Sequence, residues 1–198
     1  MSSRFTLRLQ PKKRPRLAGQ PRSAGVSPFM GRVRREKEEL EKMAYMDELT
    51  GVPNNVAFHH RMLDIDKRMR EAYLPFAVIM VDVNRLKRVN DEFGHAKGDE
   101  AICAVSRTLC QLFTLDNVYR CGGDEFVVCL EEDAYRQRRQ GFQQLMAYAV
   151  KRDFSQEQPW QQVSLAAGMA SSWPGDTFIQ VLKRADQHMY EVKERIRH

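Results

Sequence analysis

Hydrophobic runs along the chain mark the strands that we expect it to form. The segment PFAVIMVDVN, which ends at Asn84, is short, rich in Val and Ile, and bounded by Pro75 and polar residues, so it predicts a buried central strand. The segments NVYRC and EFVVCL flank Gly122-Gly123 and predict a β-hairpin. The segment VSLAAGMA, residues 163–170, predicts a further strand.

Apolar residues at helical spacing predict five helices. The first, Gly31–Met46, contains good helix formers and no breaker, but it spans only about two heptads, so a coiled-coil dimer built from it alone would be marginal. The other four cover residues 54–73, 97–113, 134–152 and 177–196. A length of 198 residues allows one ordinary domain with a short appendage, and not two full-sized domains.

The charge is distributed unevenly along the chain. Ten of the 32 Lys and Arg residues lie in residues 1–35, which contain no acid, so the remaining chain holds 22 basic and 26 acidic residues. Residues 1–30 also carry four prolines and little apolar surface, and we expect a disordered basic arm there. The arm has two interpretations. It binds RNA, an anionic membrane or an acidic partner, or it is a cloning remnant or the result of a misassigned start codon. The second interpretation is favoured. No DNA binding is expected of the domain.

The cysteine and hydropathy patterns bear on the cellular compartment. Cys103, Cys110, Cys121 and Cys129 form no C-x-x-C pair and no Cys/His grouping with zinc-site spacing, which favours reduced thiols. The longest strongly apolar run, Phe76–Val81, is far shorter than a membrane helix, and the N-terminus lacks an apolar signal core. We therefore expect a cytoplasmic protein without a transmembrane segment.

Acidic residues follow the predicted strands at two points. Asp82 lies at the end of the buried run, and Asp124 and Glu125 follow the two glycines of the hairpin. Taken singly, each acid is as well explained by a strand end or a solvated hairpin tip. Two carboxylates brought together repel each other unless a cation neutralises them, and hard oxygen ligands favour Mg²⁺ together with substrate phosphates. This combination is typical of phosphoryl-transfer chemistry.

The motif RCGGDEF at residues 120–126 resembles the signature of the GGDEF diguanylate cyclases. Three further segments resemble that family in the same order, and the resemblance spans about Asp47 to Arg197: DELTGVPNN at 47–55, DVNRLKRVNDEFGHAKGDE at 82–100 and ADQHMYEVK at 185–193. It implies an α/β (α+β) domain at residues 47–198, similar to the palm-like fold of nucleotide cyclases and polymerases, with a mostly antiparallel central sheet flanked by helices. Residues 31–46 are then a linker helix.

The resemblance also implies an activity, the condensation of two GTP molecules into cyclic di-GMP and two pyrophosphates at the interface of an antiparallel homodimer. It implies two Mg²⁺ ions, with Mn²⁺ as a possible substitute, held by Asp82, Asp124 and the backbone carbonyl of Val83. Asp124, with Glu125, would help to deprotonate the attacking ribose hydroxyl, and Lys87 would stabilise phosphate charge. The alternative is a catalytically inactive domain that binds GTP or cyclic di-GMP and regulates a partner.

Further roles follow from the same resemblance. The implied guanine-reading pair is Asn90 and Asp99, and the implied grip on the terminal phosphates is Lys193 with Arg197. The remaining implied site residues contribute backbone amides to the phosphates (Arg85, Leu86), shape the pocket (Gly94, His95) or permit the tight hairpin turn (Gly122, Gly123).

The chain departs from the family pattern at several positions. Asn84 stands where many relatives have a second aspartate, and Leu86 stands where many have phenylalanine; Asn55 replaces a frequent arginine and Ala166 a frequent serine. Where many relatives carry an R-x-x-D product-inhibition site, this chain reads Phe113-Thr114-Leu115-Asp116. Without the arginine, inhibition by the product through that site is predicted to be weak or absent.

Overall fold

The computed structural model describes residues 28–131, 141–145 and 163–197. The chain divides into two compact units, Met1–Lys37 and Glu38–His198. Helix α1 (Pro28–Tyr45) covers most of the predicted linker helix. The predicted arm lies almost entirely outside the described residues. Of the helix predicted at 134–152, the structure describes residues 141–145, which are helical.

The larger unit contains helices and strands at most of the positions that the hydrophobic pattern predicts. After α1 the elements are α2 (Asn55–Glu71), β1 (Phe76–Asn84), α3 (Leu86–Phe93), α4 (His95–Phe113), η1 (Leu115–Asn117), β2 (Val118–Arg120), β3 (Glu125–Glu131), β4 (Ser164–Ser171) and α6 (Phe178–Arg197). Among the described helices, the sequence pattern missed the short 3-10 helix η1 and the α-helix α3, which occupies part of the segment interpreted as polar and glycine-punctuated.

The four described strands form one sheet in the order β2-β3-β1-β4, and every neighbouring pair is antiparallel. The expected antiparallel α+β architecture is thus confirmed. Strand β1 is central, as its continuous burial requires. Its register aligns Asp82 with Glu125 of β3 on one side and with Ala166 of β4 on the other.

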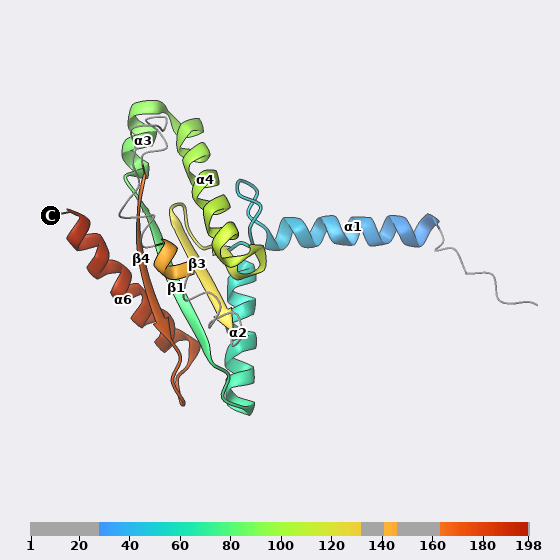
Figure 1. Cartoon of the computed structure of the whole chain (residues 1–198). Helices are drawn as coiled ribbons and strands as arrows, with labels where there is room; N and C mark the ends of the chain where they lie inside the picture. The colour runs from blue at the N-terminus through green and yellow to red at the C-terminus, as the bar shows by residue number, and fades with distance from the viewer. Residues whose placement is uncertain (1–27, 132–140, 146–162, 198) are drawn as a thin grey trace, which may run out of the picture. The chain divides into compact units, whose positions relative to one another are not determined.

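Helices cover both faces of this sheet (Figure 1). On one face, alternate residues of β1 such as Ile79 and Val81 pack with Val105 and Leu109 of α4. On the other face, the intervening residues pack with α2 and α6, as Val78 does in the cluster that contains Ile65. Asp82 follows the alternation of the second face, so its side chain emerges on the same side of the sheet as α6.

A glycine allows α6 to lie close to the sheet. A Cβ atom at Gly168 of β4 would overlap the backbone of Ala185 and Met189, so only glycine fits at this crossing. The N-terminus of α6 is fixed in turn by α2, because Asp66 accepts a hydrogen bond of 2.7 Å from the Phe178 amide. These two contacts set the position of the helix whose far end carries Lys193.

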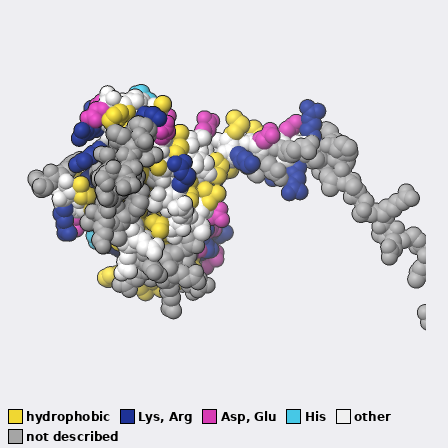
Figure 2. All heavy atoms as spheres, turned by 45° about the horizontal axis from the view of Figure 1, so that its top comes forward, with side chains coloured by type: hydrophobic (Ala, Val, Ile, Leu, Met, Phe, Trp, Pro, Cys, Tyr) yellow, Lys and Arg dark blue, Asp and Glu magenta, His cyan; other side chains and the backbone are white. Residues whose placement is uncertain are grey.

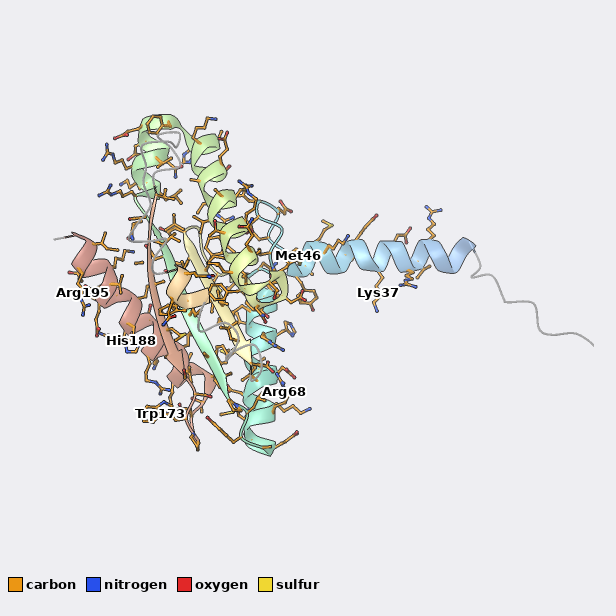
Figure 3. All side chains as sticks on the ribbon, viewed as in Figure 1. Lys37, Met46, Arg68, Trp173, His188 and Arg195 are labelled. Atoms are coloured by element: carbon orange, nitrogen blue, oxygen red, sulfur yellow. The ribbon has the colours of Figure 1, made fainter. Side chains whose placement is uncertain are left out.

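An ion-pair network joins α2 to the end of β3. Arg68 binds both carboxylate oxygens of Glu131, at 2.8 and 2.6 Å, and Arg61 approaches the same carboxylate at 2.6 Å. Arg68 is labelled on α2 in Figure 3, with His188 and Arg195 on α6. Among the described residues, no helix combines the length and apolar character that a membrane-spanning segment needs.

Candidate active site

The central acid of the site is Asp82, two residues before the end of β1. It is only 4% exposed. Its Oδ2 atom accepts a hydrogen bond of 2.6 Å from Nζ of Lys193, while Oδ1 is buried and has no hydrogen-bond partner. A buried carboxylate with one unpartnered oxygen is costly unless a cation or a donor balances it, so this atom is a candidate ligand position.

The signature turn lies directly beside Asp82. The amide of Val83 donates to the carbonyl of Asp124 at 2.9 Å, and the amide of Cys121 donates to the carbonyl of Glu125 at 3.0 Å. Arg120 adds a hydrogen bond of 2.8 Å to the carbonyl of Gly123. The acids that follow the two glycines are therefore held at the end of β1, as the sequence predicted.

The chain turns at the two predicted glycines. Neither Gly122 nor Gly123 has a positive φ, so the turn does not need glycine's left-handed conformations. At Gly122 a Cβ atom would lie 3.0 Å from the carboxylate of Glu125, an exposed side chain that can move aside. Cys121, directly before them, is largely buried, and burial followed by the nearby Glu125 charge raises its pKa to about 12, so this thiol stays protonated.

The N-terminus of α3 faces the same corner. Arg85 precedes the helix in the left-handed conformation, with φ of 66°, and no side chain caps the first turn. Uncapped amides at a helix start attract anions such as phosphates. A pocket of about 360 Å³ opens here and is lined by Asp82, Val83, Asn84, Arg85, Leu86, Lys87, Asp124, Ser164, Lys193 and Ile196.

A second pocket of about 390 Å³ shares three of these residues. It is lined by Leu86, Lys87, Asn90, Asp91, His95, Gly123 and Asp124. Asn90 lies against Gly98 of α4, where any side chain would overlap its carboxamide. Asp99, the predicted partner of Asn90, is an exposed residue next to Gly98. The shared residues make the two pockets neighbouring parts of one surface.

The structure thus gathers most of the predicted residues at one end of the sheet. Glu125 and Lys87 are exposed, and Lys193 contacts the Asp82 carboxylate. Arg197 is the last residue of α6, and its side chain lies outside the described part of the structure. Figure 2 shows basic and acidic side chains intermingled over the end of the domain where α3 and α4 meet.

Two polar residues of the first pocket were missed by the sequence analysis as site residues. Asn84 and Ser164 pair across β1 and β4, and the Nδ2 atom of the first and the Oγ atom of the second are buried without partners. The available signal was the strand alternation, because a residue two positions after Asp82 shares its face of the sheet. The spacing alone did not reveal Ser164, whose pairing depends on the sheet register.

The donors at this corner fit a hard divalent cation. The carboxylates of Asp82 and Asp124 and the carbonyl of Val83 supply oxygen atoms, and the Lys193 ammonium shows that the Asp82 site accepts positive charge. Within the described residues there is no cluster of three or more His, Cys, Asp or Glu side chains that could hold a metal. Mg²⁺ does not require one, since one or two carboxylates and substrate phosphates usually suffice.

Comparison with known proteins finds relatives that are named diguanylate cyclases. The chain is 28% identical over 161 residues to diguanylate cyclase DgcM of Escherichia coli strain K12, covering 81% of this chain and 38% of DgcM. It is 36% identical over 103 residues to diguanylate cyclase TpbB of Pseudomonas aeruginosa, covering 52% of this chain and 24% of TpbB. The chain therefore spans well under half the length of these relatives.

Solved structures agree on the fold. The coiled coil and GGDEF domain of DgcB from Caulobacter crescentus, in complex with c-di-GMP, matches with a TM-score of 0.73 at 22% identity, covering 84% of this chain and 89% of that one. The GGDEF domain of TpbB from Pseudomonas aeruginosa matches with a TM-score of 0.63 at 28% identity, covering 76% and 90%. Residues 44–198 match the family described as "Diguanylate cyclase, GGDEF domain", and the chain belongs to this family.

Proposed function

We propose that this chain is a diguanylate cyclase that condenses two GTP molecules into cyclic di-GMP and two pyrophosphates. The observation that carries the proposal is the hydrogen bond from the Val83 amide to the Asp124 carbonyl, which joins the acid-bearing signature turn to the strand end that bears Asp82. Two carboxylate-bearing segments at one pocket, in a member of this family, support metal-assisted phosphoryl transfer.

The proposed reaction consists of two equivalent displacements. In each, the ribose 3′-oxygen of one GTP forms a bond to the α-phosphorus of the other, the bond between that phosphorus and the α,β-bridging oxygen breaks, and pyrophosphate leaves. Asp124, with Glu125, accepts the proton of the 3′-hydroxyl. Lys87 lines both pockets and would stabilise charge on the phosphates.

We assign the metal position to the carboxylates of Asp82 and Asp124 and the carbonyl of Val83. Mg²⁺ is the preferred ion, with Mn²⁺ as a substitute, because all the proposed ligands are hard oxygen atoms. When bound, the ion offsets the negative charge that develops on the phosphate oxygens.

The two pockets suggest how one GTP is bound. The phosphates would lie in the first pocket, against the uncapped amides at Arg85 and Leu86, with Lys193 and Arg197 at the terminal phosphates. The base would lie in the second pocket, which Asn90 and His95 line. Asp99 is proposed to complete the reading of the guanine edge, since an amide and a carboxylate together match its donors and acceptors.

One domain presents one such site, and the reaction joins two nucleotides. We therefore propose an antiparallel homodimer as the competent species, stable or transient, acting in the cytoplasm where GTP is available. The domain boundaries proposed for it are an arm at 1–30, a linker helix at 31–46 and the cyclase domain at 47–198. The rate of such an enzyme rises faster than linearly with protein concentration while the dimer is incompletely formed.

We further propose that the product inhibits this enzyme weakly. Phe113 occupies the position of the arginine in the R-x-x-D site of many relatives; it is the last residue of α4 and is fully buried in the core cluster that also contains Val118 of β2. A buried phenyl ring offers no donor to a phosphate or a guanine, so this position contributes nothing to product binding.

The test is product formation from GTP and Mg²⁺, analysed by chromatography and mass, over a range of protein concentrations. Wild type should yield cyclic di-GMP with the expected nonlinearity, Asp124→Ala should yield none, and Glu71→Ala, an exposed acid at the end of α2, should match wild type. Folded wild-type protein that binds GTP but forms no product at any concentration would overturn the cyclase proposal in favour of a regulatory binding module.

A further inference from the structure

Lys193 of α6 and Asp82 near the end of β1 form an ion pair in the candidate site. Their Nζ and Oδ2 atoms are 2.6 Å apart, and the side chains are 23% and 6% exposed. Lys193 is thus well shielded from water, unlike a lysine on an ordinary solvated helix face. A lysine paired in this way neutralises the carboxylate, so another anion must compete with Asp82 to attract it.

The strand neighbours of Asp82 offer it no hydrogen-bond donor from a side chain. Its cross-strand neighbour on β4 is Ala166, which is fully buried and carries no donor. Its neighbour on β3 is Glu125, a further acid. In the part of the chain that the structure describes, Lys193 is the one side chain that hydrogen-bonds to Asp82, and Oδ1 has no partner.

We infer that the Lys193 ammonium group and a divalent cation compete for the Asp82 carboxylate, so that nucleotide phosphates promote metal binding by drawing Lys193 away. Two cations within a few ångströms of one shielded carboxylate repel each other strongly. A metal ion bound at the unpartnered Oδ1 would lie close to the ammonium group on Oδ2, so each cation weakens the binding of the other. An ammonium group that leaves Asp82 needs another anion to neutralise it in this partly buried place. The triphosphate can provide that anion, because Lys193 and Asp82 both line the pocket proposed for it.

The consequence is a coupling between two binding events through one side chain. Phosphates that attract Lys193 free Asp82 for metal, and by linkage bound metal releases Lys193 for the phosphates. Metal alone then binds weakly. This inference rests on the proposed function for the metal position at Asp82 and for the identity of the nucleotide, but not on catalytic turnover.

The decisive measurement is the affinity of the full chain for Mn²⁺ alone, followed by electron paramagnetic resonance of the free ion. Lys193→Met should bind Mn²⁺ at least about tenfold more tightly than wild type, a change in affinity that the loss of one competing cation readily supplies. Lys193→Gln, which stays neutral but keeps a donor for Asp82, should show the same direction if the Met variant folds poorly. Equal or weaker Mn²⁺ binding by the folded neutral variants would overturn the inference.

Two matched variants locate the effect. Lys183→Met removes an exposed lysine from the same helix and should leave Mn²⁺ affinity unchanged. Asp82→Asn in the Lys193→Met background should abolish the gain. A GTP analogue with a methylene bridge between the α- and β-phosphorus atoms cannot release pyrophosphate, but its phosphates bind Mn²⁺ themselves. The analogue should therefore raise Mn²⁺ affinity more in wild type than in Lys193→Met, and an equal rise in both would count against the coupling.

The outcomes separate this inference from the cyclase proposal. If wild type forms cyclic di-GMP while Mn²⁺ affinity is unaffected by Lys193→Met and Lys193→Gln, only the role of Lys193 falls. If the neutral variants gain Mn²⁺ affinity while wild type forms no product, the competition stands and the cyclase proposal falls.

Discussion

Arg120 and Asp47 form an ion pair that links two segments of the domain far apart in sequence. The Nη1 atom of Arg120 lies 3.0 and 3.2 Å from the carboxylate oxygens of Asp47, while its Nη2 atom donates to the carbonyl of Gly123 at 2.8 Å. Asp47 also accepts hydrogen bonds from the amide and hydroxyl of Thr50. One guanidinium group therefore holds both the turn that precedes α2 and the turn that presents Asp124.

Asp47→Asn should destabilise the domain by about 1–2 kcal/mol at pH 7, because it removes a charge-assisted partner of Arg120. Burial raises the pKa of Asp47, but hydrogen bonds from Thr50 and Arg120 outweigh it and leave the pKa below its ordinary value. A lowered folded-state pKa stabilises the protein above the unfolded-state pKa of about 3.9, and this contribution disappears as the pH falls through the folded-state pKa. Urea unfolding at several pH values measures the difference.

The difference between wild type and Asp47→Asn should therefore shrink toward zero in acid. The neighbouring exposed residue offers a control, since Glu48→Gln should change stability little at any pH. A constant difference between wild type and Asp47→Asn from neutral to strongly acidic pH would show that the ion pair is not its source.

Gly168→Ala should cost several kcal/mol of stability and most of the activity. The added methyl group overlaps backbone atoms of Ala185 and Met189, so α6 must move away from β4 and carry Lys193 with it. Thermal unfolding and product formation check the two effects. For stability, Gly123→Ala is the comparison, because a Cβ atom there meets nothing within 4 Å and φ is not in the left-handed region.

Gly98→Ala should weaken GTP binding while leaving the domain folded. A methyl group at this position overlaps the carboxamide of Asn90, which must rotate out of its place in the second pocket. Alanine favours a helix over glycine by about 1 kcal/mol, and this gain offsets part of the cost of the overlap in the free energy of unfolding. KM for GTP should rise by about tenfold or more with kcat less affected, as expected when a binding contact is lost. Unchanged KM in the folded variant would remove Asn90 from base recognition.

Cyclic di-GMP should inhibit the proposed cyclase activity weakly, because Phe113 stands where many relatives carry the arginine of their inhibitory site. Initial rates at rising product concentration, analysed for the type of inhibition, provide the test. Strong noncompetitive inhibition by low-micromolar product would contradict it. Phe113→Arg is not expected to restore inhibition, since the phenyl ring is fully buried and an arginine there disrupts the core.

Glu131→Gln should lower the free energy of unfolding by about 1–2 kcal/mol, a figure that already allows for solvent screening of its two partly exposed arginine partners. Both Arg61 and Arg68 converge on this carboxylate, and each has a buried Nε atom without a partner. Removing the charge leaves two cations side by side. The loss should be larger at low salt than at high salt, and equal losses at both would exclude a mainly electrostatic origin.

The parts of the fold that could be predicted are those whose hydrophobic pattern has a clear period. The continuous run of β1 and the helical spacing of α6 are examples, and both occur where predicted. Helix α3 escaped prediction because it is short, largely polar and begins after Arg85 in a left-handed conformation instead of after a capping residue. Its start is set by tertiary structure, which local propensity does not encode.

The candidate site divides in the same way. Asp82 and Asp124 come together because β1 and β3 are neighbours, which the strand and hairpin pattern suggested. The contact between Lys193 and Asp82 depends on how α6 crosses β4 at Gly168, and Ser164 depends on the register of β4 against β1. The spacing of residues along the chain does not predict a helix crossing or a strand register of this kind.

The placement of β4 and α6 late in the sequence has a consequence for synthesis on the ribosome. Strand β1 leaves the ribosome early, but one of its two partner strands and the helix that bears Lys193 emerge only near the end of the domain. Until then Asp82 lacks both its β4 neighbour and its ammonium partner, and contacts between such distant segments form slowly. A nascent chain that stops before residue 164 therefore lacks Ser164, Lys193 and Ile196 of the first pocket, and that pocket is complete only when the whole domain has been made.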